Sequence, residues 1–181
     1  MTEPVKAVNA AIQLSDTLTI DGYMLPDGEF RAGAVSVSAV LGYKRNWLLE
    51  IEDKSPDKLK ALSDKGYRGT SLIPVQRTGR GGTNKARTIS LKDLTALITV
   101  EALQGNKRAI ALQAAFTLEG LDGRFREAFG VEQRTADERR QFFGMTYGEF
   151  LEALAENREE LEALRLPGDD LAYPEADEEA Y

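Results

Sequence analysis

The feature that most constrains the fold is a basic, acid-free segment with β-prone residues on both sides of a glycine-rich centre. From Lys65 to Lys92 the 181-residue chain carries seven Lys or Arg and no Asp or Glu, although its formal net charge is -7. The runs 70–76 and 87–91 enclose a loop at 77–87 that is rich in glycine and cations. This order predicts a β-hairpin with a long, positively charged tip. Flexible cations on such a tip can follow a phosphate backbone without being buried.

Opposite charges are separated along the chain. Residues 152–181 carry eleven Asp or Glu and only two basic side chains, Arg158 and Arg165. The acidic balance therefore comes from the C-terminal end, and we expect residues 167–181 to form a disordered acidic tail. Because charges act within a Debye length of about 8–10 Å, the basic segment can attract an anion despite the net charge of the whole chain.

The composition excludes several kinds of active site. The chain has no Cys and no His, which rules out disulfides, thiolate metal ligands, a Ser-His-Asp triad and an imidazole base. Carboxylates alone can hold Mg²⁺, so the composition allows a magnesium-dependent nuclease, which is the least supported functional class. However, no acid-x-Lys pair follows Asp57, which suits the first turn of a helix better. We therefore expect no enzyme, no metal and no cofactor.

The length and hydropathy pattern favour a folded protein in the cytoplasm. At 42% hydrophobic residues the chain can bury a core. No run approaches the ~20 apolar residues of a membrane span, and residues 1–6 lack the pattern of a signal peptide. We expect no membrane partner.

Turn signals and hydrophobic periodicity divide the chain into strands and helices. We expect little order in 1–16, and then two short strands that begin at 17–20 and end near Phe30. Helices are expected over 34–41, 44–52, 55–66, 90–103, 107–129, 135–144 and 146–166, with the basic hairpin between the third and the fourth. The expected divisions are a domain at 17–130, a helical extension at 134–166 and the acidic tail. Tyr147, Leu154 and Leu161 fall seven residues apart, so 146–165 is a possible homodimer seam or simply a packed helix.

The stretch 36–51 fits a helix-turn-helix. Ser38, Leu41, Gly42, Tyr43 and Leu48 fill the places that need a small residue, apolar anchors and a turn glycine. Lys44, Arg45 and Asn46 would then open the second helix, at the end that meets base edges or phosphates. A generic helical hairpin would give the same pattern. With the basic hairpin as a wing, the prediction is an α+β fold: a helix-turn-helix-like unit, a β-hairpin wing and then packed helices.

Nine side chains are predicted to contact nucleic acid through charge or hydrogen bonds. They are Lys44, Arg45, Asn46, Lys65, Arg68, Arg77, Arg80, Lys85 and Arg87. The alternative is that 77–87 is a solvated loop that binds no ligand.

Three stretches carry a resemblance to a known family. They are 88–94 (TISLKDL), 105–112 (GNKRAIAL) and 121–129 (LDGRFREAF). With the order of the elements, these stretches resemble phage antirepressor-type proteins of the BRO-N/KilA-N kind and uncharacterised bacterial relatives, over roughly 17–130. The resemblance implies DNA binding and a role in phage or prophage regulation. No second antirepressor domain is recognisable in the chain.

The sequence thus predicts a regulatory protein that binds double-stranded DNA and contacts phosphate through the basic loop. The alternative is a protein-interaction or oligomerisation module that acts on other regulators, such as a repressor, without direct DNA contact.

Overall fold

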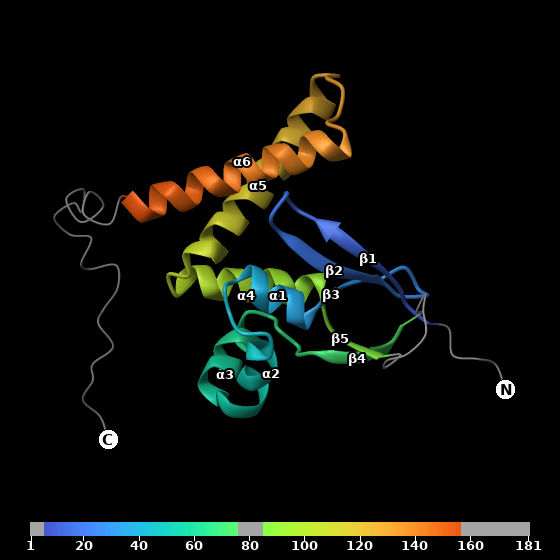
Figure 1. The fold of residues 1–181 in the computed structure, drawn as a ribbon, viewed down its shortest axis with the longest axis vertical. Helices are drawn as coiled ribbons and strands as arrows, with labels where there is room; N and C mark the ends of the chain where they lie inside the picture. The colour runs from blue at the N-terminus through green and yellow to red at the C-terminus, as the bar shows by residue number, and fades with distance from the viewer. Residues whose placement is uncertain (1–5, 76–84, 157–181) are drawn as a thin grey trace.

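A computed structural model describes residues 6–75 and 85–156, which form an α+β fold (Figure 1). The described part contains a five-stranded antiparallel sheet and six helices. In chain order they are β1 (Val8–Gln13), β2 (Thr19–Met24), β3 (Phe30–Gly33), α1 (Ala34–Val40), α2 (Trp47–Lys54), α3 (Pro56–Asp64), β4 (Ser71–Pro74), β5 (Lys85–Ser90), α4 (Leu91–Leu103), α5 (Lys107–Ala128) and α6 (Ala136–Glu156). The α+β class is confirmed.

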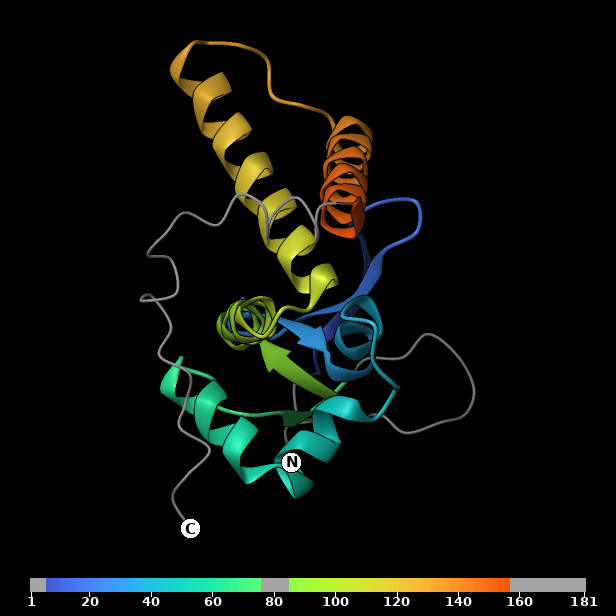
Figure 2. The ribbon, with the colours of Figure 1, turned by 90° about the vertical axis from the view of Figure 1, so that its left-hand side faces the viewer.

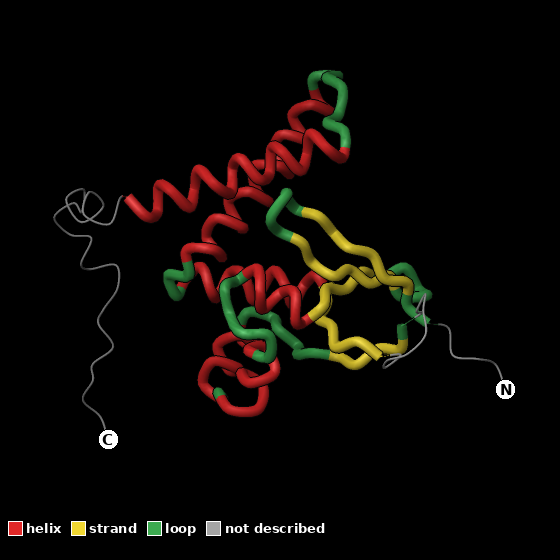
Figure 3. The backbone as a smooth tube through the Cα atoms, in the orientation of Figure 1, coloured by secondary structure: helices red, strands yellow, loops and turns green. Residues whose placement is uncertain are grey.

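The sheet has the strand order β1-β2-β3-β5-β4. β1 and β2 form a hairpin with Ile12 opposite Ile20, and β5 lies between β3 and β4. The sheet curls (Figure 3), and the chain just before β1 reaches the far strand, where the Ala7 amide donates to the Pro74 carbonyl at 3.0 Å. The hairpin predicted from 70–76 and 87–91 is present as β4 and β5, but it is part of this sheet.

The main core lies between the sheet and the helices. Val37 of α1, Ile89 of β5, Leu97 of α4 and Leu112 of α5 are all fully buried there. α4 begins where the sequence predicts, because Ser90 forms a capping box. Its hydroxyl accepts from the Asp93 amide at 3.0 Å, and the Asp93 carboxylate accepts from the Ser90 amide at 3.2 Å.

α5 and α6 form a helical arm that extends away from the sheet (Figures 1 and 2). In its outer part, Asp122 of α5 accepts from Arg126 of the same helix at 2.8 Å and from Arg134, in the connection to α6, at 2.9 Å. Apolar side chains point outward instead, and Phe125 and Phe129 are 63% and 77% exposed. Charged groups thus tie the α5–α6 connection to α5, whereas large apolar side chains are exposed on the arm.

Three local predictions are wrong. β1 occupies 8–13, within the stretch expected to have little order. α6 is continuous through Gly144, where the sequence predicts a break between 135–144 and 146–166. Gly144 is needed for close packing, since a Cβ there would lie 3.0 Å from the Ser15 Cβ. α2 begins at Trp47, so Lys44, Arg45 and Asn46 precede the helix.

Several other predictions concern residues beyond the described part. Most of the basic loop, with Arg77 and Arg80, and the acidic tail at 167–181 lie outside it. At the predicted dimer seam, Tyr147 is packed in the main core and Leu161 lies outside the described residues. No helix within 6–75 and 85–156 is both long and apolar enough to cross a membrane.

Candidate nucleic-acid interface

The α1–α2 turn carries the three residues that are predicted from the sequence to contact bases or phosphates. Lys44, Arg45 and Asn46 are exposed. The turn closes through a hydrogen bond from the Trp47 amide to the Lys44 carbonyl at 2.9 Å, and the Asn46 carbonyl accepts the first helical bond of α2 from Glu50 at 3.0 Å. Asn46 is therefore the N-cap residue, and its side chain makes no capping hydrogen bond. All three residues precede the first turn of α2, whereas the sequence predicts them within that turn.

Two aromatic rings bracket this turn. Tyr43 and Trp47 stack with their centroids 3.8 Å apart and their planes at 10°. The Lys58 ammonium, from α3, lies 5.0 Å from the Trp47 centroid and 5.7 Å from the Tyr43 centroid. Such a cation over the ring faces favours this arrangement of the two rings.

A buried carboxylate holds the turn from behind. Glu101 of α4 is 1% exposed, and the Lys58 ammonium lies 2.6 Å from its Oε1 as an ion pair without an aligned hydrogen bond. The Tyr43 hydroxyl donates to Glu101 Oε2. Burial, with this hydrogen bond, raises the pKa of Tyr43 above its ordinary value, so the hydroxyl keeps its proton and remains a donor. A residue 58 positions away thus fixes one end of the turn.

A third cation joins the turn from α5. Gly42 has a φ of +86°, which favours glycine, and a Cβ there would lie 3.1 Å from Cδ and 3.2 Å from Nε of Arg108. Arg108 is exposed and packs over Gly42, which lies two residues before Lys44 in the sequence. Sequence reasoning missed Arg108, because the Asn106 cap predicts where α5 begins but not which turn it approaches.

A second basic group lies on the connection between α3 and β4. Lys65 and Arg68 are exposed there. The Arg68 amide donates to Asp93 Oδ1 at 2.6 Å, and Asp93 is 3% exposed. Glu52 of α2 accepts from the Thr70 amide at 2.6 Å and from its hydroxyl at 2.7 Å. The main chain that carries these cations is therefore fixed by two carboxylates.

β5 carries two further cations that the sequence predicts as contacts, Lys85 and Arg87. Both are exposed, and Arg87 Nη1 donates to the Thr70 hydroxyl at 3.2 Å. Arg68 also lines a hollow of about 470 Å³ together with Lys92 and the acidic residues Glu29 and Asp93. Arg87 is thus linked to the α3–β4 connection through Thr70, whereas Lys85 lies opposite Pro74 at the other end of β4.

The selected cations are not neutralised by nearby carboxylates. Among the described residues, none of Lys44, Arg45, Lys65, Arg68, Lys85 and Arg87 takes part in an ion pair. α3 separates the two groups: Lys58 lies beside the turn, and Lys65 is seven residues further on, roughly 10 Å along the helix axis. Of the predicted residues within the described part of the chain, three therefore lie on the α1–α2 turn and the others on the α3–β4 connection and on β5.

The exposed side of α2 is unsuited to nucleic acid. Glu50 and Asp53 are exposed on this helix, and carboxylates repel phosphates. Cations and an exposed side-chain amide, that of Asn46, occur together just before the N-terminal end of α2. Asp57, which the sequence assigns to a first helical turn, lies in the first turn of α3 as predicted.

Comparison with protein families, with curated proteins and with solved structures found no match to this chain.

Proposed function

We propose that the chain is a DNA-binding regulatory protein of the cytoplasm, with an antirepressor-like role in a phage or prophage. The observation that carries this proposal is the α1–α2 turn. Lys44 and Arg45 are exposed and make no ion pair with a described residue, and the turn is anchored by the buried Glu101. A preorganised set of cations loses little freedom on binding, and cations supply most of the affinity for DNA.

The two basic groups have different roles in this proposal. α1 and α2 act as a helix-turn-helix in which only the turn and the first residues of α2 enter the groove, because Glu50 and Asp53 disfavour deeper insertion. β4 and β5 act as the wing. β5 pairs with both β3 and β4, so Lys85 and Arg87 are held by the sheet in position for phosphate contacts.

The affinity of the full chain for labelled duplex DNA, measured by fluorescence anisotropy across a salt series, tests this proposal. The K44A/R45A variant should bind more weakly, and each lost phosphate contact should lower the log–log salt slope by about 0.9. Arg124→Ala is the matched control, because Arg124 is an exposed cation on the outer half of α5. Equal losses in the double variant and the control would contradict a specific role for the turn.

A second comparison separates base contacts from phosphate contacts. It uses one duplex selected from a random pool and one random duplex. Asn46→Ala should reduce binding to the selected duplex by about 1–3 kcal/mol and leave random DNA almost unaffected. Replacing Arg77, Arg80, Lys85 and Arg87 together by Ala should weaken both duplexes alike. If Asn46→Ala weakens both equally, the turn only positions the backbone.

The second candidate function is a module that contacts other regulators. The outward apolar face of the helical arm favours it, since Leu121, Phe125 and Phe129 are exposed on α5. If the full chain fails to bind duplex DNA even at low salt, where phosphate contacts are strongest, the DNA-binding proposal is wrong and the arm becomes the leading interaction surface.

A further inference from the structure

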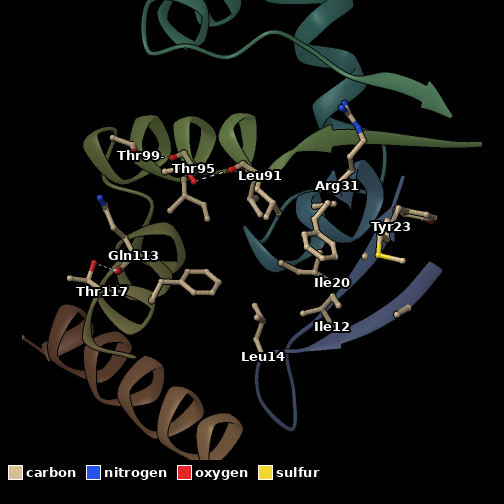
Figure 4. Close-up of a pocket in the computed structure, with 18 of the residues that line it drawn as sticks. Ile12, Leu14, Ile20, Tyr23, Arg31, Leu91, Thr95, Thr99, Gln113 and Thr117 are labelled. Atoms are coloured by element: carbon tan, nitrogen blue, oxygen red, sulfur yellow. Dashed lines mark hydrogen bonds between the residues drawn. The ribbon is translucent and has the colours of Figure 1, made fainter. Parts of the chain in front are cut away.

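An open apolar groove lies on one face of the sheet. It has a volume of about 700 Å³ and runs between the strands β1, β2 and β3 and the helices α4 and α5. Ile12, Leu14 and Ile20 line it from the hairpin, and Leu91 lines it from α4 (Figure 4). Phe30 at its edge is 59% exposed. Apolar surface of this kind is unusual unless something covers it.

Four of the polar side chains that line the groove already have partners. The hydroxyls of Thr95, Thr99 and Thr117 donate to carbonyls of their own helices at 2.8–2.9 Å. Arg31 donates to Thr88 at 2.9 Å and to Glu29 at 2.8 Å. An occupant is therefore held mainly by apolar contacts, and further hydrogen bonds can come from main-chain groups beside the groove.

The main chain of β1 supplies such hydrogen bonds beside the groove. The Leu14 amide donates across the hairpin to Leu18, whereas the Ala7 amide donates on the opposite side, to Pro74. Because main-chain groups alternate along a strand, the amides of Asn9, Ala11 and Gln13 point away from β2.

Beyond Ala7, this outer edge pairs with no strand among the described residues, and Arg140 of α6 donates to the Gln13 side chain at its far end. All six residues of β1 are exposed, and the strand contains no charged residue, no proline and no glycine. The opposite edge strand, β4, is four residues long, ends in Pro74 and is met by Ala7. Natural sheets protect exposed edges with charges, prolines or a covering segment. β1 has no charge and no proline, which leaves a covering segment as the remaining protection.

We propose that β1 pairs with β1 of a second copy of this chain, antiparallel and about a two-fold axis at Ala11. In this register Ala11 lies opposite Ala11, the polar Asn9 lies opposite Gln13, and the small Ala10 lies opposite the large Ile12. Each strand contributes the amides of Asn9, Ala11 and Gln13. The pairing creates no like-charge contact, because the strand is uncharged.

The same register also extends the groove. A two-fold axis perpendicular to the sheet keeps the two groove-lining faces on the same side of the joined sheet. Val8, Ala10 and Ile12 line the groove in each copy, so the two grooves meet across the new strand pair as one apolar surface. The pairing holds whether or not the chain binds DNA.

The oligomeric state of the full chain, measured by sedimentation equilibrium over a wide range of protein concentration without DNA, tests the proposal. The chain should form a dimer. Ala11→Pro removes one outward amide from each copy, and edge strands tolerate proline where the amide faces outward. Losing two hydrogen bonds per dimer should weaken association roughly ten- to a hundredfold. The matched control Ala11→Thr keeps the amide and should remain dimeric.

Hydrogen exchange of the unmodified chain tests the same pairing without a substitution. The amides of Asn9, Ala11 and Gln13 should become protected as the protein concentration rises, whereas those of Ala10 and Ile12 should be protected at every concentration. A chain that stays monomeric overturns the proposal. So does a dimer in which the three amides exchange freely, or one that a folded Ala11→Pro variant forms with undiminished affinity.

Discussion

Replacing Lys58 by Met is expected to destabilise the chain more than replacing Glu101 by Gln, although the two residues form one ion pair. The reason is their unequal access to water. Glu101 is 1% exposed, whereas Lys58 is 25% exposed. Without Lys58 the carboxylate stays buried and uncompensated; without Glu101 the ammonium can turn to solvent.

The size of each loss of stability depends on the hydrogen bonds to residue 101 that persist in the variant. Breaking a buried pair costs about 3–5 kcal/mol, and we expect about 3 kcal/mol for Lys58→Met because the Tyr43 hydroxyl and the Asn106 amide still donate to Glu101. Glu101→Gln should cost about 1 kcal/mol, since the amide oxygen still accepts from Tyr43. The double variant buries no charge and should lose about 2 kcal/mol less than the sum of the single variants.

Denaturant unfolding followed by tryptophan fluorescence measures these effects. Trp47 is the only tryptophan of the chain and stacks on Tyr43 beside Lys58, so its emission reports on this network. Variants are compared where the dependence of the unfolding free energy on denaturant concentration is unchanged, because a shift of the unfolding midpoint then reports a change in stability. Equal losses from the two single variants, or a double variant whose loss equals their sum, would refute the account of Glu101 as a buried, uncompensated charge.

Three further results are expected. Gly42→Ala should lower the free energy of unfolding by about 1–2 kcal/mol, because a φ of +86° is strained for alanine and the new Cβ meets Arg108. Gly120→Ala, on helical backbone with open space around it, should instead raise the free energy of unfolding by up to about 1 kcal/mol. The hydrogen bond from Arg134 lowers the pKa of Asp122, so the stabilisation of the arm by ionised Asp122 is complete above the ordinary Asp value of about 4 and is lost as pH falls through the lowered pKa. Hydrogen exchange of the arm should accelerate over that pH range, and in Asp122→Asn it should be fast at every pH. An unchanged profile would show that the contact does not stabilise the arm. Deleting 168–181 should tighten DNA binding at low salt and have no effect at ~1 M salt, where the Debye length is ~3 Å; equal low-salt affinities with and without the segment would exclude competition between tail and DNA.

Sequence reasoning succeeded where a local signal determines the structure. Ser90 and Asn106 accept from amides two or three residues ahead, so the starts of α4 and α5 could be predicted from residue type and spacing. β1 gave no such signal. Val8, Ala10 and Ile12 alternate with Asn9 and Gln13, but Ala11 weakens this pattern and all six side chains are exposed. The strand is held by its pairing with β2, which the residues of β1 alone do not reveal.

The candidate site was only partly predictable for the same reason. Exposure of Lys44 and Arg45 follows from their type, and the structure confirms it. The groups that fix their turn come from α3, α4 and α5, and the spacing of Lys58, Glu101 and Arg108 in the sequence contains nothing that links them to Gly42 or Tyr43. Helix boundaries near such contacts shift as well, since α2 starts only after the turn has closed on Lys44.

The position of two acids explains why the cations of the turn and of the α3–β4 connection form no ion pair with another described residue. Asp93 and Glu101 are almost fully buried, and their oxygens accept hydrogen bonds from the Arg68 amide and from the Tyr43 hydroxyl. Each carboxylate therefore fixes the segment that carries a cation instead of pairing with that cation at the surface. A surface carboxylate in the same place would gain at most about 1 kcal/mol from an exposed ion pair and would screen the cation from a phosphate. Burying the acids behind the turn and the α3–β4 connection gives these segments rigidity and leaves their outward charge positive.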